Sequence, residues 1–252
     1  MSGSIRFRLI GLPPSTNNLY TIVAGRQVLS RAGRSYHEAV AALAAELAPD
    51  GPISGPIALR ISYRLGSHDR DVDGSHKALI DGLSGICFND DRQVVLLSLN
   101  KTRAALDELP SVEVIIRPLT ALPADRTLRA HHDGFRLTTT LLPPSTNNSY
   151  AIAGRVRRKT REAKMVETAY RGAFTRLAAG TAPLEGPVRV RIHYGFNADR
   201  RDVDGSHKLL LDAARGLLWV DDRQISSLTL SKARSSGAPR LELAGEGGSS
   251  VR

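Results

Sequence analysis

The sequence contains a single cysteine, Cys87, among its 252 residues. One thiol cannot form an internal disulfide, and a zinc site built on cysteines is excluded as well. No apolar run approaches the length of a membrane span, and the N-terminus lacks the apolar core of a signal peptide. We therefore expect a cytoplasmic protein without a membrane partner.

Acidic residues are in the minority, and they are unevenly distributed. The chain has 35 Lys and Arg against 25 Asp and Glu, which gives a formal net charge of +10. Residues 1–120 carry 13 basic and 12 acidic side chains, so nearly all of the excess lies in the remainder. Such a basic surface favours a polyanionic partner, above all nucleic acid, although a merely solubilising surface would have the same composition.

What the sequence does contain is an internal duplication. Residues 71–77, Asp-Val-Asp-Gly-Ser-His-Lys, recur without change at residues 202–208. The segment Pro-Pro-Ser-Thr-Asn-Asn occurs at residues 13–18 and 143–148, and Asp-Asp-Arg-Gln at residues 90–93 and 221–224. The offset of 130 or 131 residues exceeds the period of solenoid repeats, so we predict two whole domains.

We place these domains at residues 1–117 and 133–244. Prolines and mixed polarity at residues 118–132 predict a semi-extended linker, and the Gly- and Ser-rich residues 245–252 predict a disordered tail.

Apolar periodicity indicates the fold of each copy. Apolar and polar residues alternate, as in half-buried strands, at residues 5–9 and 57–63, and residues 93–99 and 112–116 are further strand candidates. One apolar stripe at Tyr36, Val40, Leu43 and Leu47 predicts a helix, and residues 77–84 fit a second, short one. Residues 13–18 are expected to form a rigid loop. Each copy is therefore predicted to be an α+β domain, with a small mixed β-sheet and two helices.

Each copy also carries carboxylates and one lysine in the same order. Asp71 and Asp73 are two residues apart and point the same way in an extended segment, and the pair Asp90-Asp91 follows. Mg²⁺, or Mn²⁺ in its place, prefers such oxygen ligands together with a substrate phosphate. Lys77 cannot bind a metal, but its charge can act on a phosphate oxygen or an attacking water. The set favours metal-dependent phosphodiester hydrolysis.

Simpler interpretations exist for the same residues. Asp-x-Asp pairs often cap loops, Lys77 and Asp81 have the spacing of a helix ion pair, and paired aspartates form turns. His76 is either a general base or a residue that caps its helix. Phe88 and Trp219 are either core residues or wedges that insert between bases. The recurrence of the whole set in register in both copies favours a functional site.

These motifs resemble those of the RusA family of Holliday junction resolvases, the crossover junction endodeoxyribonucleases. The resemblance rests on Arg70-Asp71-Val72-Asp73, Lys77, Asp81 and Asp90-Asp91-Arg92-Gln93, on their equivalents in the second copy, and on Pro13 to Asn17. It implies an α+β fold and Mg²⁺-dependent cleavage of four-way DNA junctions. By resemblance, the metal-binding and catalytic aspartates are Asp71, Asp73, Asp91, Asp202, Asp204 and Asp222, and the catalytic lysines are Lys77 and Lys208.

The sequence departs from the family pattern in two respects. Gly74 and Gly205 stand where the family usually has Asn, so one side-chain hydrogen bond near each site is missing. The spacing from the helix to the Asp-Asp pair is also one residue shorter than in the family in both copies, so the third carboxylate is either Asp90 or Asp91, and we choose Asp91 and its equivalent Asp222.

Family members act as homodimers of a single domain, whereas this chain has two copies. We therefore expect a pseudo-two-fold dimer within one chain, nucleoid-associated and acting on branched DNA by paired nicks. The basic residues expected to contact DNA are Arg26, Arg31, Arg34, Arg155, Arg157, Arg158, Lys159, Arg161 and Lys164. The alternatives are a non-catalytic branched-DNA binding protein and a metal-dependent phosphohydrolase acting on small phosphate esters. The absence of a Gly-rich phosphate loop argues against the phosphohydrolase.

Overall fold

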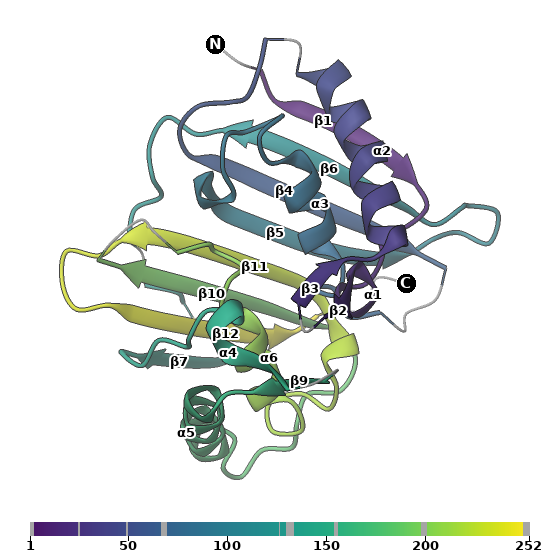
Figure 1. Ribbon diagram of the computed structural model, residues 1–252. Coiled ribbons are helices and arrows are strands. Elements are labelled where there is room, and N and C mark those ends of the chain that lie inside the picture. The colour runs from purple at the N-terminus through teal and green to yellow at the C-terminus, as the bar shows by residue number, and fades with distance from the viewer. Residues whose placement is uncertain are drawn as a thin grey trace. The chain divides into compact units, whose positions relative to one another are not determined.

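The computed structural model describes residues 3–24, 26–48, 50–66, 70–125, 127–129, 134–153, 156–197 and 201–248. The chain divides into two compact units, Met1–Leu122 and Pro123–Arg252 (Figure 1). None of the described helices combines the length and apolar composition that crossing a bilayer requires.

The first unit is built on a mixed four-stranded sheet. Its strands, in spatial order, are β1 (Ile5–Ile10), β6 (Ser111–Pro118), β4 (Ile57–Leu65) and β5 (Val94–Arg103). Only β4 and β5 run parallel, and the other neighbours are antiparallel. Alternate residues of β4, among them Leu59 and Ile61, are buried, so one face of the sheet forms the core.

Two helices cover that face of the sheet. α2 (Arg31–Leu47) and α3 (His76–Leu83) lie against each other (Figure 1), and a Cβ added at Gly82 would come within 3.1 Å of the Val40 side chain. Ser30 caps α2, since its Oγ accepts a hydrogen bond from the Gly33 amide at 3.0 Å. The close packing of small residues thus fixes α3 over the sheet.

Three short elements were not predicted from the sequence. α1 (Thr16–Leu19) lies in the segment expected to be a rigid loop, and a hairpin of β2 (Tyr20–Val23) and β3 (Arg26–Leu29) follows it. Ala24 adopts a positive φ of 47° at the turn of this hairpin. Each element spans only four residues and is largely exposed, which gives too short a pattern for periodicity to detect.

The second unit repeats this order. Its elements are β7 (Phe135–Thr139), α4 (Thr146–Ser149), β8 (Tyr150–Ala153), β9 (Val156–Lys159), α5 (Arg161–Leu177), β10 (Val188–Phe196), α6 (His207–Ala214), β11 (Ile225–Arg234) and β12 (Arg240–Gly247). The sheet order is β7-β12-β10-β11, and β10 and β11 are its parallel pair. The predicted α+β fold with a mixed sheet in each of two tandem copies is confirmed. In both units a short 3-10 helix precedes the last pair of strands, η1 (Asp91–Gln93) and η2 (Asp222–Gln224).

The aromatic residues Phe88 and Trp219 occupy equivalent places in the two cores. Both are fully buried, and the Trp219 ring lies 5.8 Å from that of Phe135, centroid to centroid. Of the two interpretations open at the sequence level, this burial supports core residues rather than wedges for DNA.

A strand extends into the segment that was predicted to be a disordered tail from Gly245. β12 continues to Gly247, and Gly245 pairs with Phe135 of β7. A Cβ at Gly245 would collide with the Phe135 ring, so glycine is required where this strand crosses the aromatic side chain. Residues 245–247 therefore form a strand instead of a disordered tail, while residues 249–252 lie outside the described part of the chain.

Candidate active site

The acidic motif of each unit follows a central strand and leads into a short helix. In the first unit, the Gly74 amide donates to the Asp71 carbonyl oxygen at 3.0 Å and closes a tight turn. Thr16 then binds the Gly74 carbonyl oxygen twice, through its amide at 2.6 Å and its hydroxyl at 3.0 Å. Thr146 binds Gly205 in the same way, at 2.5 and 2.8 Å. The proline motif thus serves to hold the aspartate loop.

The two turns leave little room for a side chain at Gly74 and Gly205. A Cβ at Gly74 would lie 3.1 Å from the Asp71 carbonyl oxygen, and one at Gly205 would lie 3.3 Å from that of Asp202. These distances are shorter than ordinary van der Waals contact, so the tight turn favours the residue without a side chain. The departure from the asparagine of the family pattern is therefore compatible with the turn that forms here.

A buried lysine behind each acidic loop was not foreseen. Lys101 of β5 donates to the Arg70 carbonyl oxygen at 2.7 Å, although the residue is only 6% exposed. Arg70 in turn donates to the Pro13 carbonyl oxygen at 3.2 Å. Lys232 and Arg201 make the equivalent bonds in the second unit. The available signal was a lysine in phase with the buried residues of its strand, at the same place in both copies.

The histidines of the motif have a structural role in this arrangement. His76 Nδ1 lies 2.9 Å from the Asp73 carbonyl oxygen, and His207 Nδ1 lies 2.9 Å from that of Asp204. Both histidines are buried at the first residue of their helices. Their rings therefore fasten the helix start to the acidic loop, which supports the interpretation as a capping residue over that as a general base.

Asp73 and Asp204 are buried beside the core tyrosines of the central strands. Burial raises the pKa of Tyr63 well above its ordinary value, and the charge of Asp73 raises it further. The pKa of Tyr194 is raised in the same way by burial and by Asp204 among its neighbours. These carboxylates thus lie at the junction of the core with the acidic loop.

Lys77 brings two other carboxylates together. Its Nζ lies 3.1 Å from Asp91 Oδ2 and 3.0 Å from Asp81 Oδ1. Asp81 Oδ2 also accepts a hydrogen bond from the Tyr20 hydroxyl at 2.9 Å. Lys208 bridges Asp222 and Asp212 in the second unit, at 3.3 Å from each. A lysine, two carboxylates and the preceding acidic loop therefore recur as one constellation.

The neighbouring aspartate has a different role. Asp90 caps η1: its Oδ1 accepts from the Arg92 amide at 2.8 Å, and its own amide donates to Gln93. Hydrogen bonds from the side chain and amide of Arg92 lower the pKa of Asp90. Asp221 caps η2 in the same way. Asp91, and not Asp90, is thus the residue of the pair that faces the lysine.

Comparison with known proteins agrees with this constellation. The family model for endodeoxyribonuclease RusA matches residues 11–117 and residues 142–244. The chain belongs to the RusA endodeoxyribonuclease family. The two matched segments are consistent with a tandem duplication of the RusA domain, and each contains a complete acidic motif with its proline motif. No curated protein matches the chain.

The two RusA domains differ at the third carboxylate. Trp219 Nε1 donates to Asp222 Oδ1 at 2.8 Å, whereas the equivalent Phe88 has no donor group. The Asp222 side chain is 3% exposed and that of Asp91 is 27% exposed. The constellation of the second domain is therefore the more enclosed of the two.

In the second domain, a further lysine, Lys159, contacts one of the carboxylates around Lys208. Lys159 Nζ lies 3.1 Å from Asp212 Oδ2 and 2.8 Å from Glu167 Oε1. Burial lowers the pKa of Lys159, but the hydrogen bonds that it donates to these two carboxylates, together with their charges, outweigh burial, and the pKa is raised. Leu29 and His37 stand at the positions of Lys159 and Glu167 in the first domain. Lys159, which we expected to contact DNA, is thus directed at carboxylates of its own domain.

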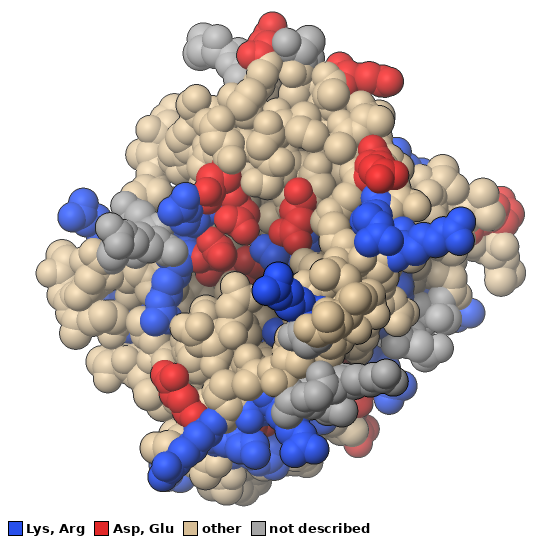
Figure 2. Space-filling model, viewed as in Figure 1, with Lys and Arg blue, Asp and Glu red and all other residues tan. Residues whose placement is uncertain are grey.

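The other basic residues expected to contact DNA lie at the surface. They occupy the hairpin and the start of the long helix in each RusA domain, and the exposed ones are Arg26, Arg31, Arg34, Arg157, Arg158, Arg161 and Lys164. Arg157 stacks over the Tyr150 ring at 4.3 Å from its centroid. Arg155 lies outside the described residues. Figure 2 shows basic side chains gathered around the position of α5, and acidic ones around that of α3.

RusA endonucleases generally depend on a divalent metal. The donors here are carboxylate oxygens, which suit a hard cation such as Mg²⁺. Among the residues that the structure describes, however, no three His, Cys, Asp or Glu side chains converge closely enough to hold an ion. Lysine ammonium groups balance Asp91 and Asp222 instead. Which three carboxylates would hold the ion therefore stays a prediction.

Proposed function

We propose that the chain is a divalent-metal-dependent endonuclease that resolves four-way DNA junctions by paired nicks, one from each RusA domain. The two nuclease domains comprise residues 1–117 and 133–244, joined by residues 118–132. The observation that carries this proposal is that both domains retain the acidic loop together with a lysine bound to a further carboxylate. Neither copy has lost a member of the set, as a copy kept only for structure would be free to do.

The proposed metal site of each domain consists of its three aspartates. Asp71, Asp73 and Asp91 would hold Mg²⁺, or Mn²⁺, in the first domain, and their counterparts Asp202, Asp204 and Asp222 in the second. When bound, such an ion polarises a phosphate oxygen and lowers the pKa of a water molecule. Lys77, whose Nζ lies 3.1 Å from Asp91 Oδ2, would bind a phosphate oxygen at the same site.

Exposed arginines would hold the DNA backbone. Those of the hairpin and of the helix start lie on the chain segment that follows the proline motif, which is bonded to the acidic loop through Thr16 or Thr146. Phosphate contacts of this kind give sequence-independent affinity that falls with salt. Removal of one such arginine, for example Arg158→Ala, should reduce the salt dependence of junction binding by about one phosphate contact.

The duplication suits a substrate with near two-fold symmetry. Balanced resolution of a four-way junction requires two opposed cuts, which a homodimer supplies from two equivalent sites. We propose that this chain supplies them as a covalent pseudo-dimer. A tether raises the effective concentration of the second domain and removes the need for subunit association.

The test uses a four-way junction whose strands carry different labels, incubated with Mg²⁺. Asp71→Asn and Asp202→Asn should each abolish one nick of the pair, and the double variant should abolish both while still binding the junction. Ser4→Ala serves as the control, because Ser4 is exposed and lies more than 60 residues before the first acidic motif. Full nicking by the double variant would refute the proposal.

A non-catalytic branched-DNA binding protein is the second candidate. It is favoured by the ion pairs in which Lys77 and Lys208 already engage Asp91 and Asp222. The single tryptophan of the chain, Trp219, donates a hydrogen bond to Asp222, so its fluorescence can report metal binding at this site independently of nicking. Titration with Mn²⁺ should quench its fluorescence, and Asp202→Asn should abolish the quenching. Tight junction binding with neither quenching nor nicking would select the second candidate.

A further inference from the structure

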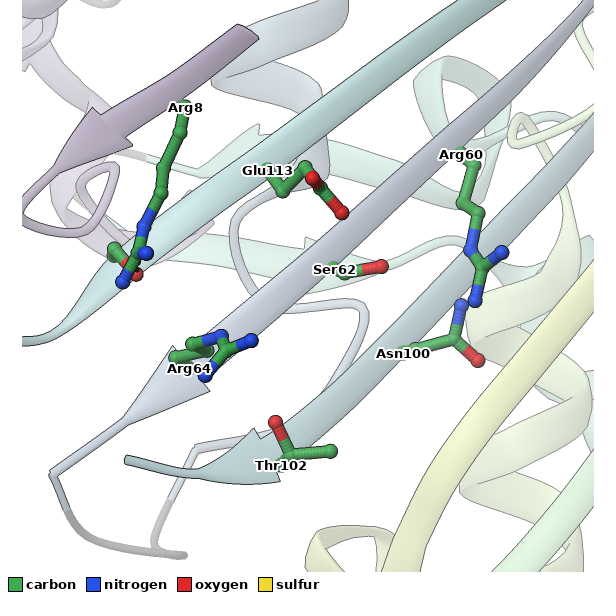
Figure 3. Close-up of a pocket in the computed structure, with 8 residues that line it drawn as sticks. Arg8, Arg60, Ser62, Arg64, Asn100, Thr102 and Glu113 are labelled. Carbon is green, nitrogen blue, oxygen red and sulfur yellow. Dashed lines mark hydrogen bonds between the residues drawn. The ribbon is translucent and has the colours of Figure 1, made fainter. Parts of the chain in front are cut away.

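The sheet of the first domain has a second face, opposite to the helices, and this face is polar. Residues of β4 that alternate with the buried ones, Arg60, Ser62 and Arg64, point to it. With Arg8 of β1 and Glu113 of β6 they surround a cleft of about 370 Å³ (Figure 3). The metal site proposed above uses none of these residues, so the cleft requires its own explanation.

The equivalent face of the second domain is covered by the chain itself. Residues 123–125 and 127–129 cross it and have no regular structure. Asp125 Oδ1 accepts from His193 Nε2 at 3.0 Å and from Arg240 Nη2 at 2.8 Å. The Leu128 amide donates to Glu242 Oε2 at 2.5 Å, and Arg191 Nη2 donates to a main-chain carbonyl oxygen of the segment at 2.9 Å. An extended segment is thus held by its main chain and by the carboxylate of Asp125.

Both groups that bind the main chain of this segment recur in the first domain. Strand register places Ser62 opposite Glu113, as it places His193 opposite Glu242. Arg60 precedes Ser62 by two residues, as Arg191 precedes His193. In the part of the chain that the structure describes, Arg60 makes no hydrogen bond or ion pair and is exposed. The first domain therefore has a donor and an acceptor for a peptide main chain, at matching positions.

Two arginines of the cleft already bind a carboxylate of the same domain. Arg8 and Arg64 both bind the side chain of Glu108, the latter at 3.0 Å. Glu108 comes from the turn between β5 and β6 and is a carboxylate of the domain itself. Two guanidinium groups can share a second carboxylate or exchange it for the first, because this pairing at the surface is worth little. Arg8 and Arg64 could thus bind a carboxylate of a ligand, as His193 and Arg240 bind that of Asp125.

The lining of the cleft is mixed in charge, with Arg8, Arg60 and Arg64 beside Glu113. Glu113 would repel a phosphate group placed against it, because like charges repel. A peptide, in contrast, offers amide groups to Glu113, as Leu128 does to Glu242. We propose that the cleft binds an extended peptide segment of a partner protein that carries a carboxylate, with Arg60 on a main-chain carbonyl oxygen, Glu113 on an amide, and Arg8 with Arg64 on the carboxylate.

The probe is a fluorescein-labelled peptide with the sequence of residues 121–130, Ala-Leu-Pro-Ala-Asp-Arg-Thr-Leu-Arg-Ala, added to the full-length protein at low salt. The second domain already holds this segment intramolecularly, so saturable binding reports on the first domain. Fluorescence anisotropy should give affinity for this peptide and at least fivefold less for the peptide with Asn in place of Asp125.

Protein variants locate the binding. Arg60→Ala should weaken peptide binding about tenfold, as expected for the loss of one charge-assisted hydrogen bond. Arg103→Ala is the matched control, because Arg103 is an exposed arginine of β5 on the opposite side from Thr102, which lines the cleft. No saturable binding, or equal binding by the two variants, would overturn the proposal. So would a loss of junction binding in Arg60→Ala with peptide binding unchanged, which would instead make the cleft a nucleic-acid surface.

Discussion

Trp219 Nε1 donates a 2.8 Å hydrogen bond to Asp222 Oδ1. The equivalent pair in the first domain, Phe88 and Asp91, has no such bond, because phenylalanine has no donor. Asp222 is consequently held by both an indole and an ammonium group and is almost completely buried. The two copies thus share the same acidic residues but differ in how firmly the last of them is fixed.

The indole bond should contribute to the stability of the second domain. Trp219→Phe keeps an aromatic ring that the first domain already accommodates, but it leaves a buried carboxylate oxygen without its donor. We expect a loss of about 1–3 kcal/mol in the free energy of unfolding. Urea denaturation followed by circular dichroism measures it. A change under about 0.5 kcal/mol would mean that the bond contributes nothing beyond packing.

The lysine that bridges two carboxylates should matter for nicking. Lys77→Met removes the charge and leaves Asp81 and Asp91 to repel each other. In an Asp202→Asn background, where only the first domain acts, we expect nicking to fall on the order of a hundredfold. Lys77→Arg keeps the charge and should retain part of the activity. Nicking within threefold of the parent protein for Lys77→Met would assign the lysine to structure alone.

Acid should weaken the cap of η1. Hydrogen bonds from Arg92 lower the pKa of Asp90 in the folded protein, so Asp90 stabilises the fold above its unfolded pKa of about 3.9. This contribution disappears as the pH falls through the lower, folded value. Asp90→Asn should therefore be less stable than the parent at pH 6, and the difference should shrink below pH 4. Thermal unfolding at both pH values tests this, and an equal difference at each would contradict it.

The single cysteine should be protected from alkylation. Cys87 is completely buried, and burial raises its pKa to about 11. The thiol is therefore neutral and inaccessible at pH 8, and only the thiolate reacts. We expect iodoacetamide to modify it at least a hundredfold more slowly in the native protein than in 6 M urea, as measured by mass spectrometry. Rapid native modification would show that the first domain opens readily.

The long elements could be predicted from the sequence, because their patterns extend over many residues. β4 alternates buried and exposed positions over nine residues, and α2 carries its apolar stripe over 17. The four-residue hairpin strands offer two positions per face, which is too few to distinguish from chance. Lys101 was missed for another reason, since a lysine is normally counted as a surface residue whatever its phase.

Part of the candidate site could not be predicted from the sequence, because it depends on how distant residues come together in the fold. Asp90 and Asp91 are adjacent, and only the turn of η1 determines which faces Lys77 and which caps the helix. Charge clustering placed Lys159 at the surface with its neighbours, but its partner Asp212 lies 53 residues further along the chain. No local pattern reports a pairing of that range.

The double hydrogen bonds from Thr16 to Gly74 and from Thr146 to Gly205 have a consequence for engineering. Each joins two stretches of chain almost 60 residues apart into one mechanical piece, and the joining atoms are the same in both halves. If residues 70–93 were exchanged for residues 201–224, the threonine of the recipient domain could still bind the glycine carbonyl oxygen of the inserted loop. Such a chimaera would place the hydrogen bond between Trp219 and Asp222 in the first domain without further changes to the segment that holds the loop.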